Sequence, residues 1–579
     1  METRYSVESV MKLEVPNFLF FWGHTASVGK ITKACLSQWW MCEFVVDGVL
    51  YNCAEQYMMA SKALCFGDEE SYRKILLEKD PQNIKGLGRK IKDYSDEIWD
   101  RHKYDVVKRA NIAKFFQNKD LKEFLLATGD AILVEASPYD KIWGIGMKEN
   151  DKDVLNPSLW KGSNLLGFAL MEVRDILREE DVCYLDCDVA DKIRGCLMAG
   201  AAGDALGYEV EFMSYKQILS LYGERGITQF VLGDNNKALV SDDTQMTLFT
   251  ANGLLLGITR CSMRGIGGPP ESYVSLAYGD WYYTQNPSTY REGMHKYTWL
   301  LGLLEMAHRR APGITCLTAC ESIINNKEVK NNSKGCGGIM RVAPISLLMA
   351  GHKHQGVWTY SLAELANAGA EIAKVTHKHP LGFLPAALLS VFIYKLAFLS
   401  IEEIKRDIDV VIEDTLSVLN LIYEHRYDSD KQYLKILTRK VVCLAKSDMA
   451  DIDAIAELGE GWTAEEAWAI SLYCVIRHID SVEDAIIASV NHDGDSDSTG
   501  SITGNIMGVI YGYKHIKALN LFCPQGCVFE DTIELSEIIL AMAEDLFTSC
   551  VISEWNPIDT PRKMQWYERY CCSMAVGIR

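Results

Sequence analysis

The chain has 579 residues, 48% of them hydrophobic and 24% charged, with a formal net charge of −19. This length exceeds what one hydrophobic core ordinarily holds, so we expect at least two domains. The apolar content excludes an intrinsically disordered chain. The lack of a long apolar run and of a basic-then-apolar start predicts a cytoplasmic protein that does not bind or span a membrane. The 18 scattered cysteines predict reduced thiols rather than disulfides or zinc sites.

The acidic charge is unevenly distributed along the chain. Residues 1–180 carry 25 basic and 28 acidic side chains, whereas the remainder carries 34 and 50. Such acidity disfavours nucleic-acid binding through bulk charge. The basic segment 85–122 is a local exception, which we interpret as a solvated helical surface rather than a binding groove.

The first region mixes strand-like and helical patterns. Phe18–Trp22 and Phe44–Tyr51 are rich in β-forming residues, and Asp47-Gly48 within the second predicts a hairpin turn. In the predicted helix that follows, Glu55 and Lys62 fall on one face, about 10 Å apart along the axis. A carboxylate and an amine are therefore expected to lie near each other.

The second region has a helical pattern throughout. We place the domain boundary in the charged stretch 174–188, which predicts an α+β domain at residues 15–178 and an all-α domain at residues 188–555, so that the chain is mainly α. Apolar residues recur in the second region about every 3.6 residues. The segments with this period are 297–308, 360–376, 383–397, 402–424, 463–479, 482–490, 498–513 and 532–549.

The clearest chemical signal is a glycine-bounded acidic turn, His492–Gly500. Asp495 and Asp497 alternate there with hydroxyl residues, and alternation in an extended segment places both carboxylates on one side. Oxygen donors of this kind suit Mg²⁺, Ca²⁺ or Mn²⁺ rather than zinc. A second acidic turn, Ser241–Thr244, would face the first and make a shared or two-metal site. The alternative for either turn alone is a solvated loop or a helix N-cap.

A stripe of glycines follows the acidic turn. Gly500, Gly504, Gly508 and Gly512 recur at every fourth position of a predicted helix, although glycine costs about 1 kcal/mol relative to alanine in a helix. The stripe predicts very close approach of another helix. It would hold the acidic turn in the middle of a helical bundle.

Five motifs follow one another in this region: Gly200–Gly207, Ser241–Thr244, Gly335–Pro344, Thr376-His377 and Gly494–Gly500. In this order they resemble the motifs of ADP-ribosylglycohydrolases, a family that includes dinitrogenase-reductase-activating glycohydrolase and the ADP-ribosylarginine hydrolases. The resemblance implies a compact all-helical fold and a central site with two Mg²⁺ ions, with Mn²⁺ as the alternative. The metals would orient a water while the bond to C1″ of ADP-ribose breaks.

The resemblance also implies roles for individual residues. A general base would be Asp243 or Asp495 from the metal shell, or Glu209 or Glu211 outside it. Ser241 stands where the family usually has Thr, and Cys336 where it usually has Asn. The implied metal ligands are Ser241, Asp242, Asp243, Asp495, Asp497 and Ser498. The implied substrate-binding residues are Asp204, Glu209, Gly335, Gly337, Gly338, Met340 and His377.

A second set of motifs runs through the first region: Phe20–Trp22, Ser37–Trp39, Asn52–Tyr57, Lys62-Ala63, Lys114-Phe115, Leu133–Glu135, Asp140–Gly146 and Asn164–Gly167. These resemble the NADAR (NAD- and ADP-ribose-associated) family. The resemblance implies an N-glycosidase that acts on riboflavin-pathway intermediates or removes ADP-ribose from guanine bases, and that needs no cofactor.

The chemistry expected of this region follows from its side chains. A carboxyl among aromatic rings has a raised pKa, so Glu55 suits general acid–base catalysis, and a desolvated Lys62 would attack C1″. The aromatic rings offer stacking faces for a base. The resemblance implies that the catalytic residues are Glu55, Lys62 and Asp140. The substrate-binding candidates are Trp22, Trp39, Asn52, Trp143 and Gly144.

Together the two regions predict a two-domain enzyme that removes ADP-ribose. Its partners would be ADP-ribose and ADP-ribosylated proteins, nucleic acids or nucleosides, with arginine as the acceptor for the second domain and guanine for the first. In one alternative, the first domain cleaves a riboflavin-pathway metabolite. Another makes one domain a non-catalytic reader of ADP-ribose. The sequence does not determine the oligomeric state.

Overall fold

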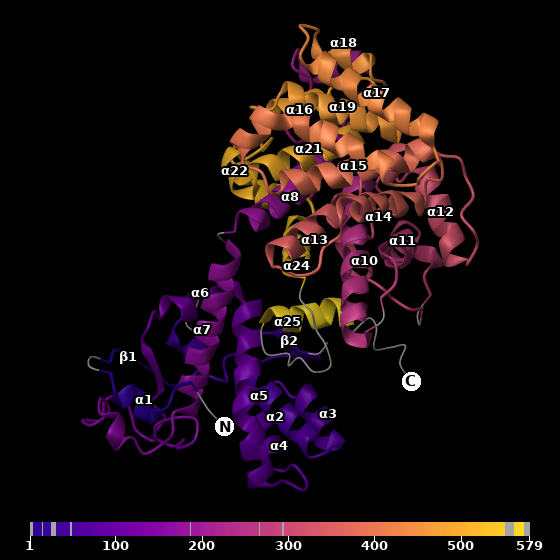
Figure 1. Ribbon diagram of the computed structural model, residues 1–579. Helices are drawn as coiled ribbons and strands as arrows, with labels where there is room; N and C mark the ends of the chain where they lie inside the picture. Colours follow the sequence, from indigo (N-terminus) through magenta and orange to yellow (C-terminus); the bar gives the residue numbers. More distant parts are fainter. Residues whose placement is uncertain are drawn as a thin grey trace. The chain divides into compact units, whose positions relative to one another are not determined.

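The computed structural model describes residues 4–13, 16–24, 30–46, 49–185, 187–265, 267–291, 294–549 and 561–571. These residues form two compact units: the first contains the described residues up to Tyr184 together with 561–568, and the second contains those from Leu185 to Ser549 together with 569–571. The first unit combines helices with short strands, and the second consists of helices joined by loops (Figure 1). The chain is therefore mainly α, with a small α+β region before a larger helical domain, as predicted.

Two short strand pairs form the β part of the first unit. β1 (Phe18–Phe21) runs parallel to β4 (Ile132–Glu135), and β2 (Phe44–Val46) runs antiparallel to β3 (Val49–Tyr51). The predicted Asp47-Gly48 turn lies outside the described residues. The helices of this unit are α1 (Val7–Met11), α2 (Ala54–Cys65), α3 (Glu69–Leu77), α4 (Pro81–Gly88), α5 (Asp96–Gln117), α6 (Lys119–Ala127), α7 (Leu165–Leu185) and α25 (Pro561–Trp566).

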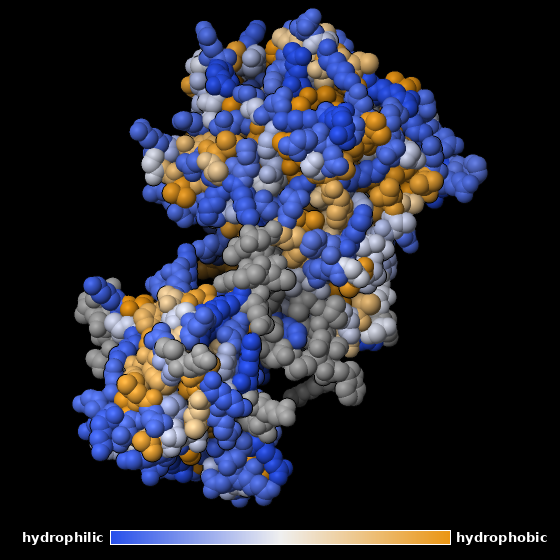
Figure 2. Space-filling view, turned by 60° about the vertical axis from the view of Figure 1, so that its left-hand side comes forward, coloured by the Kyte–Doolittle hydropathy of each residue, from blue (hydrophilic) through white to orange (hydrophobic). Residues whose placement is uncertain are grey.

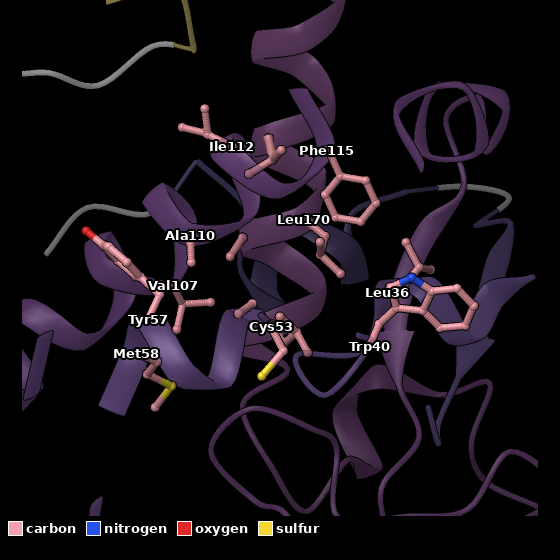
Figure 3. Close-up of a cluster of buried hydrophobic side chains, with 14 of the residues drawn as sticks. Leu36, Trp40, Cys53, Tyr57, Met58, Val107, Ala110, Ile112, Phe115 and Leu170 are labelled. Carbon is pink, nitrogen blue, oxygen red and sulfur yellow. The ribbon is translucent and has the colours of Figure 1, made fainter. Parts of the chain in front are cut away.

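Helix α2 is the centre of the first unit. It packs against α3, α4 and α5. Figure 3 shows Tyr57 and Met58 of α2 in the same apolar cluster as Val107 and Ala110 of α5. Burial of nearly all of the first two turns of α2 also takes Glu55 out of water, leaving it 4% exposed.

The second unit is built around two glycine-rich helices, α8 (Asp188–Tyr208) and α21 (Ser496–Tyr511), which lie side by side (Figure 1). A Cβ on Gly504 would stand 2.1 Å from the carbonyl oxygen of Ala199, and one on Gly203 would stand 2.0 Å from that of Gly500. The close approach predicted from the glycine stripe is confirmed. It brings the C-terminal end of α8 against the first turn of α21.

The remaining helices surround this pair. They are α9 (Tyr215–Tyr222), α10 (Asp242–Arg264), α11 (Pro270–Gln285), α12 (Ile314–Ile324), α13 (Ala343–His354), α14 (Leu362–Lys374), α15 (Pro380–Leu396), α16 (Ile401–Ser417), α17 (Asp428–Ala445), α18 (Asp451–Ala456), α19 (Ala464–Arg477), α20 (Val482–Val490), α22 (Tyr513–Leu519), α23 (Phe529–Thr532) and α24 (Ser536–Thr548).

The predicted helix 297–308 is wrong. The segment contains two 3-10 turns, Leu300–Gly302 and Leu304–Met306, and no α-helix. The buried carboxylate of Asp280 accepts the N–H groups of Tyr297 and Thr298, at 2.8 and 2.7 Å. Asp280 belongs to another helix, α11, and by accepting these N–H groups it fixes the segment 297–308 as a loop.

The hydropathy of the surface and the state of the cysteines agree with what the composition predicts. On the face shown in Figure 2, hydrophilic residues predominate and apolar residues are interspersed among them. No helix within the described ranges is long and apolar enough to cross a membrane. The cysteines whose side chains the structure describes are free thiols.

Candidate active sites

The acidic turn before α21 is shaped by hydrogen bonds within the protein. The Asn491 amide donates to the Ile227 carbonyl at 3.0 Å and accepts from its N–H at 2.8 Å. The N–H of Asp495 donates to the carbonyl of Glu460 at 2.8 Å. Gly494 has φ 137°, and a Cβ there would stand 1.9 Å from that same carbonyl. Only glycine fits this position, so the turn is fixed by its own backbone.

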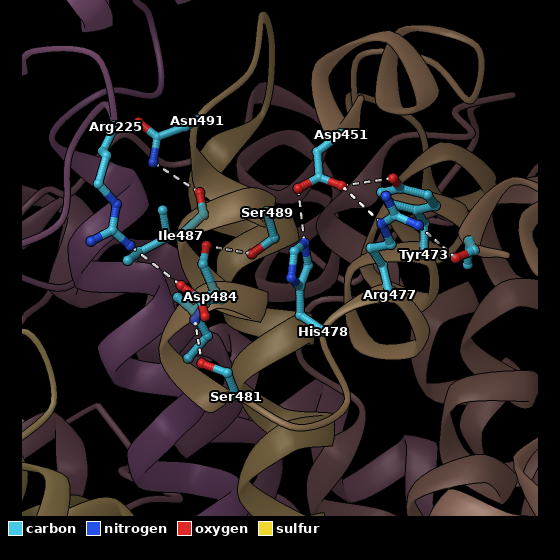
Figure 4. A network of polar contacts seen from close by, with 12 residues as sticks. Arg225, Asp451, Tyr473, Arg477, His478, Ser481, Asp484, Ile487, Ser489 and Asn491 are labelled. Carbon is cyan, nitrogen blue, oxygen red and sulfur yellow. Dashed lines mark hydrogen bonds and ion pairs between the residues drawn. The ribbon is translucent and has the colours of Figure 1, made fainter. Parts of the chain in front are cut away.

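The elements around this turn are fixed by a polar network (Figure 4). Ser481 caps α20 by accepting the N–H of Asp484 at 3.1 Å. Asp451 lies 2.8 Å from His478 Nε2 and accepts from the Tyr473 hydroxyl at 2.8 Å. The donors and acceptors of these side chains satisfy one another's hydrogen bonds, so we assign the network a structural role.

Asp495 and Asp497 stand at the start of α21. Asp495 is the N-cap residue, and Asp497 lies in the first turn of the helix. Both carboxylates accept the N–H of Ser498, at 3.2 and 2.8 Å. The predicted extended alternation is wrong here, because the helix begins one residue after Asp495. A helix N-terminus nevertheless gathers the two carboxylates at the same amide.

The second acidic turn is held by a buried carboxylate of α8. Asp204 accepts the N–H groups of Ser241 and Thr244, at 3.0 and 3.1 Å. Ser241 in turn caps α10, since its hydroxyl accepts the N–H of Asp243 at 3.1 Å. Asp204 therefore fixes the turn that presents Asp242 and Asp243, rather than standing open to a ligand.

The structure brings the two acidic turns together. The hydroxyl of Ser498 donates to Asp243 Oδ1 at 3.4 Å and lies 3.9 Å from the sulfur of Met340. The thiol of Cys336 donates to Asp495 Oδ2 at 2.8 Å. Residues from α10, from the glycine turn and from α21 thus converge on one buried point.

Many carboxyl groups are concentrated at this point. Burial and then repulsion between the carboxyls raise the pKa values of Asp242, Asp243 and Asp497 well above the usual range. Burial, followed by Asp497 and Asp242, raises the pKa of Glu211 to about 9. Within the described residues, Asp243 Oδ2 and Glu211 Oε2 have no hydrogen-bond partner. Unpartnered buried oxygens of this kind are stabilised only by a proton or a cation.

Glu211, rather than Glu209, belongs to this cluster. Glu209 is exposed at the end of α8, and its carboxylate accepts from the Tyr222 hydroxyl at 3.5 Å. The two residues are separated by one position in a short irregular segment. The sequence did not tell them apart, because the segment after α8 has no period that assigns a face.

The glycine turn and His377 lie side by side. A Cβ on Gly335 would stand 3.3 Å from His377 Nε2, and one on Gly337 would stand 3.1 Å from the same ring. Burial, followed by the charge of Arg341, lowers the pKa of His377 to about 3. The histidine is therefore neutral. Gly338 is packed too tightly for a side chain, since a Cβ there would meet the Gly382 carbonyl at 2.7 Å.

The first unit contains a separate pocket of about 700 Å³. Glu55 of α2 and Glu135 at the end of β4 both line it. Its walls include Trp22, Trp39 and Trp143, as the stacking prediction requires, and the cations Lys85 and Arg89 at the end of α4. The other lining residues are Gly23, His24, Ser37, Gln38, Met58, Ser137, Tyr139, Asp140, Lys141, Ile142 and Leu166.

The pocket keeps its two glutamates out of water. Burial raises the pKa of Glu55, although Lys85 and Trp39 act in the opposite direction. Burial, followed by repulsion from Asp140, raises the pKa of Glu135 to about 8. Burial therefore favours the protonated form of both side chains, which is the form that a general acid requires.

Lys62 is not part of this pocket. Its amine donates to the Gly88 carbonyl at 3.1 Å and lies 3.8 Å from the centre of the Tyr94 ring. The helical spacing placed Lys62 within reach of Glu55, but the tertiary partners turn its amine to α4. The amine that does line the pocket is Lys85, which the sequence analysis treated as part of a solvated surface.

Three other predicted residues shape the unit rather than lie at the centre of the pocket. Asp140 lines the rim, and its carboxylate accepts the N–H groups of Ile142 and Trp143 at 2.9 and 2.8 Å. Asn52 binds the carbonyl of Glu78 at 3.3 Å and is absent from the lining. Gly144 is required by packing, since a Cβ there would stand 2.8 Å from the Glu135 carbonyl.

Comparison with known proteins decides the family. The ADP-ribosylglycohydrolase family matches residues 186–551, more than half of the chain. The chain belongs to the ADP-ribosylglycohydrolase family. It also carries a NADAR domain, which matches residues 20–178. As a member of this family, whose enzymes are generally metal-dependent, the protein is a glycosidase that hydrolyses N-glycosyl bonds.

Individual relatives cover parts of the chain. N-glycosidase R617 of Acanthamoeba polyphaga mimivirus is 42% identical over 168 residues, 28% of this chain and 98% of the relative. Protein irg-1 of Caenorhabditis elegans is 43% identical over 129 residues, 22% of this chain and 61% of the relative. N-glycosidase YbiA of Escherichia coli (strain K12) is 34% identical over 135 residues, which are 23% of this chain and 76% of the relative. A solved ADP-ribosylglycohydrolase-related protein complex aligns over 62% of this chain and 99% of its own, with a TM-score of 0.39 and 19% identity.

Proposed function

We propose that this glycosidase removes ADP-ribose from two kinds of acceptor, with one active site in each unit. The observation that carries the proposal is the acidic cluster of the second unit. It gathers the aspartates of two turns that lie far apart in the sequence, and no lysine or arginine forms an ion pair with them within the described residues. A structural role would not need so many unpaired buried carboxyls.

The donor set fits a hard divalent cation. The carboxyls are buried and repel one another, and Asp243 Oδ2 has no partner in the described part of the chain, so a cation would relieve both costs. No three His, Cys, Asp or Glu side chains among the described residues are already arranged around one metal position, so ligation requires these side chains to move inward. When bound, the metal would act as a Lewis acid and lower the pKa of a water. The proposed ligands for two Mg²⁺ ions, with Mn²⁺ as the alternative, are Ser241, Asp242, Asp243, Asp495, Asp497 and Ser498.

Glu211 is the residue to which we assign proton transfer. It lies beside Asp497, with whose carboxyl it interacts, and burial together with this neighbour raises its pKa to about 9. A carboxyl that holds a proton would donate it to the departing nitrogen as the bond to C1″ breaks. Gly335 and Gly337 would bring backbone N–H groups near the diphosphate, with neutral His377 beside them. The acceptor we propose is a modified arginine side chain.

The pocket of the first unit supports removal of ADP-ribose from a guanine-type base. The named N-glycosidases among its relatives support the same bond type. Glu55 or Glu135 would protonate the departing base, and the other carboxyl would orient the attacking water. Trp22, Trp39 and Trp143 would stack on the base. Lys85 and Arg89 would meet the phosphates.

The test is release of free ADP-ribose from an ADP-ribosyl-arginine peptide and from ADP-ribosyl-guanosine, each with Mg²⁺ and with EDTA. We expect release from the arginine substrate only with Mg²⁺, and from the guanosine substrate in both conditions. Release from neither substrate would refute the proposal. Cleavage of a phosphorylated riboflavin-pathway intermediate in place of the guanosine substrate would reassign the first unit.

A further inference from the structure

Two exposed aromatic rings stack on each other in the second unit. The centroids of Phe212 and Trp462 are 6.2 Å apart, with an angle of 21° between the ring planes. Phe212 is 75% exposed and Trp462 is 39% exposed. Because a large aromatic surface in water is costly, two such exposed rings held nearly parallel indicate a place where a flat group binds.

Each ring is attached to a different wall of the acidic cluster. Phe212 directly follows Glu211, whose carboxyl lies beside Asp497. Trp462 directly follows Gly461, where a Cβ would stand only 3.3 Å from the Cβ of Asp495. The ring pair therefore spans the two sides of the cluster.

The backbone of Trp462 is fixed from a third element. Its carbonyl accepts the N–H of Cys336 at 3.1 Å, and the Cys336 thiol donates to Asp495. The bridge between Gly335 and Thr463 continues this contact. Trp462 is therefore held in register with the glycine turn and cannot move independently of the carboxylates.

With Glu211 as the proposed proton donor, this position would be next to the reacting carbon and not at the far end of the substrate. The adenine of ADP-ribose is separated from C1″ by two sugars and a diphosphate, whereas the rings are one residue away from Glu211 and one from Gly461, which packs on Asp495. The group that would lie here is the one bonded to C1″, which is the acceptor. An aromatic face beside unpaired carboxylates favours a planar cation.

A guanidinium group has the required properties. It is planar, permanently charged and weakly hydrated, and it stacks on aromatic faces. We propose that Phe212 and Trp462 form the acceptor subsite of the second unit and bind the guanidinium of ADP-ribosylated arginine by stacking. The inference rests on the proposed function of this site and assigns two residues to the selection of the acceptor.

The kinetic test compares two substrates that differ only in the acceptor. ADP-ribosyl-arginine and ADP-ribosyl-serine peptides are hydrolysed by the wild type and by F212A, W462A, F212Y and W462F. We expect F212A and W462A each to lower kcat/KM for the arginine peptide by about 5-fold or more, mainly through KM, as loss of a cation–π contact at an exposed site implies. F212Y and W462F keep a ring and should stay within about 3-fold of the wild type.

Two controls separate binding of the acceptor from a structural effect. Affinity for free ADP-ribose, which lacks the acceptor, should be unchanged in every variant. Tyr433→Ala removes a half-exposed aromatic side chain from α17, 48% exposed, and should alter neither substrate. Equal loss of ADP-ribose affinity, or an unchanged KM for the arginine peptide in W462A, would overturn the inference.

A binding measurement keeps this inference separate from the proposed activity. Agmatine, a free guanidinium compound, is titrated into tryptophan-labelled protein in the presence of ADP-ribose, and the indole N–H signal of Trp462 is identified by its loss in W462F. We expect agmatine to shift that signal in the wild type and not in F212A. A shift without hydrolysis of the arginine peptide would refute the proposed activity and leave the subsite standing. No shift would refute the subsite.

Discussion

Glu135 is a half-buried residue whose carboxyl oxygen Oε2 the fold buries and leaves unsatisfied among the residues that the structure describes. Its Oε2 has no hydrogen-bond partner within the described residues, and burial, followed by Asp140, raises its pKa to about 8. Its pKa in an unfolded chain is about 4.3. Between these two values the folded chain keeps a proton that the unfolded chain has lost. The free energy of unfolding therefore falls as the pH rises through this window.

Glu135→Gln should remove this dependence. As the pH rises from 5 to 8, we expect the variant to gain about 3 to 4 kcal/mol of stability relative to the wild type, measured by calorimetry on the first unfolding transition. Glu123→Gln, at an exposed position of α6, is the matched control and should leave the pH profile unchanged. A constant difference between Glu135→Gln and the wild type at all pH values would show that Glu135 is ionised in the fold.

Individual residues also show which parts of the sites could be predicted from the sequence. The acidic turns were found because oxygen donors close together in the sequence indicate a cation site without any knowledge of the fold. Lys62 lies outside the pocket lining because helical spacing gives a face and not the tertiary partner, which is the Gly88 carbonyl. Lys85 and Glu135 were missed as pocket residues because they belong to different elements that meet only in the fold.

Helices α8 and α21 make a prediction at the level of secondary-structure elements. In an ordinary helix, replacing glycine by alanine stabilises by about 1 kcal/mol. At Gly504 the new Cβ would stand 2.1 Å from the Ala199 carbonyl oxygen and 3.0 Å from the Gly200 backbone. Because both neighbours are backbone atoms, the two helices would have to separate.

Gly504→Ala should therefore lower the stability of the second unit, by about 1 to 3 kcal/mol, with the sign opposite to helix propensity. Gly86→Ala in α4 provides the contrast, since nothing lies within 4 Å of its Cβ position. It should stabilise by up to about 1 kcal/mol. Denaturant unfolding of both variants measures whether each substitution raises or lowers the free energy of unfolding. Stabilisation by Gly504→Ala would mean that α8 and α21 are not in contact in solution.

The glycine stripe of α21 and the segment 297–308 show where sequence patterns predict an element correctly and where they do not. A glycine every fourth residue can be read from one chain segment, because the period itself encodes the contact. The loop at 297–308 looked helical by its apolar spacing, but Asp280 takes two of its N–H groups from outside the segment. A capping side chain that is distant in the sequence leaves no local signal.

At the scale of the whole molecule, each unit contains a complete candidate site. The acidic cluster is built from residues 204–498, and the pocket of the first unit from residues 22–166. Neither site uses a described side chain from the other unit. The two activities should therefore be separable by single substitutions that leave the fold intact.

Asp495→Asn and Glu55→Gln are the substitutions that test this separation. Asparagine keeps the N-cap of α21 but removes the charge, so Mg²⁺-dependent release from the arginine substrate should fall by on the order of 10² or more. Glutamine at position 55 keeps the shape and removes the transferable proton, so release from the guanosine substrate should fall by about 10² to 10⁴. In each variant the other activity should equal that of the wild type in the same preparation, which also shows that the chain is folded. If either substitution removed both activities from a folded protein, the two sites would act as one, and the assignment of one glycosidase to each unit would have to be abandoned.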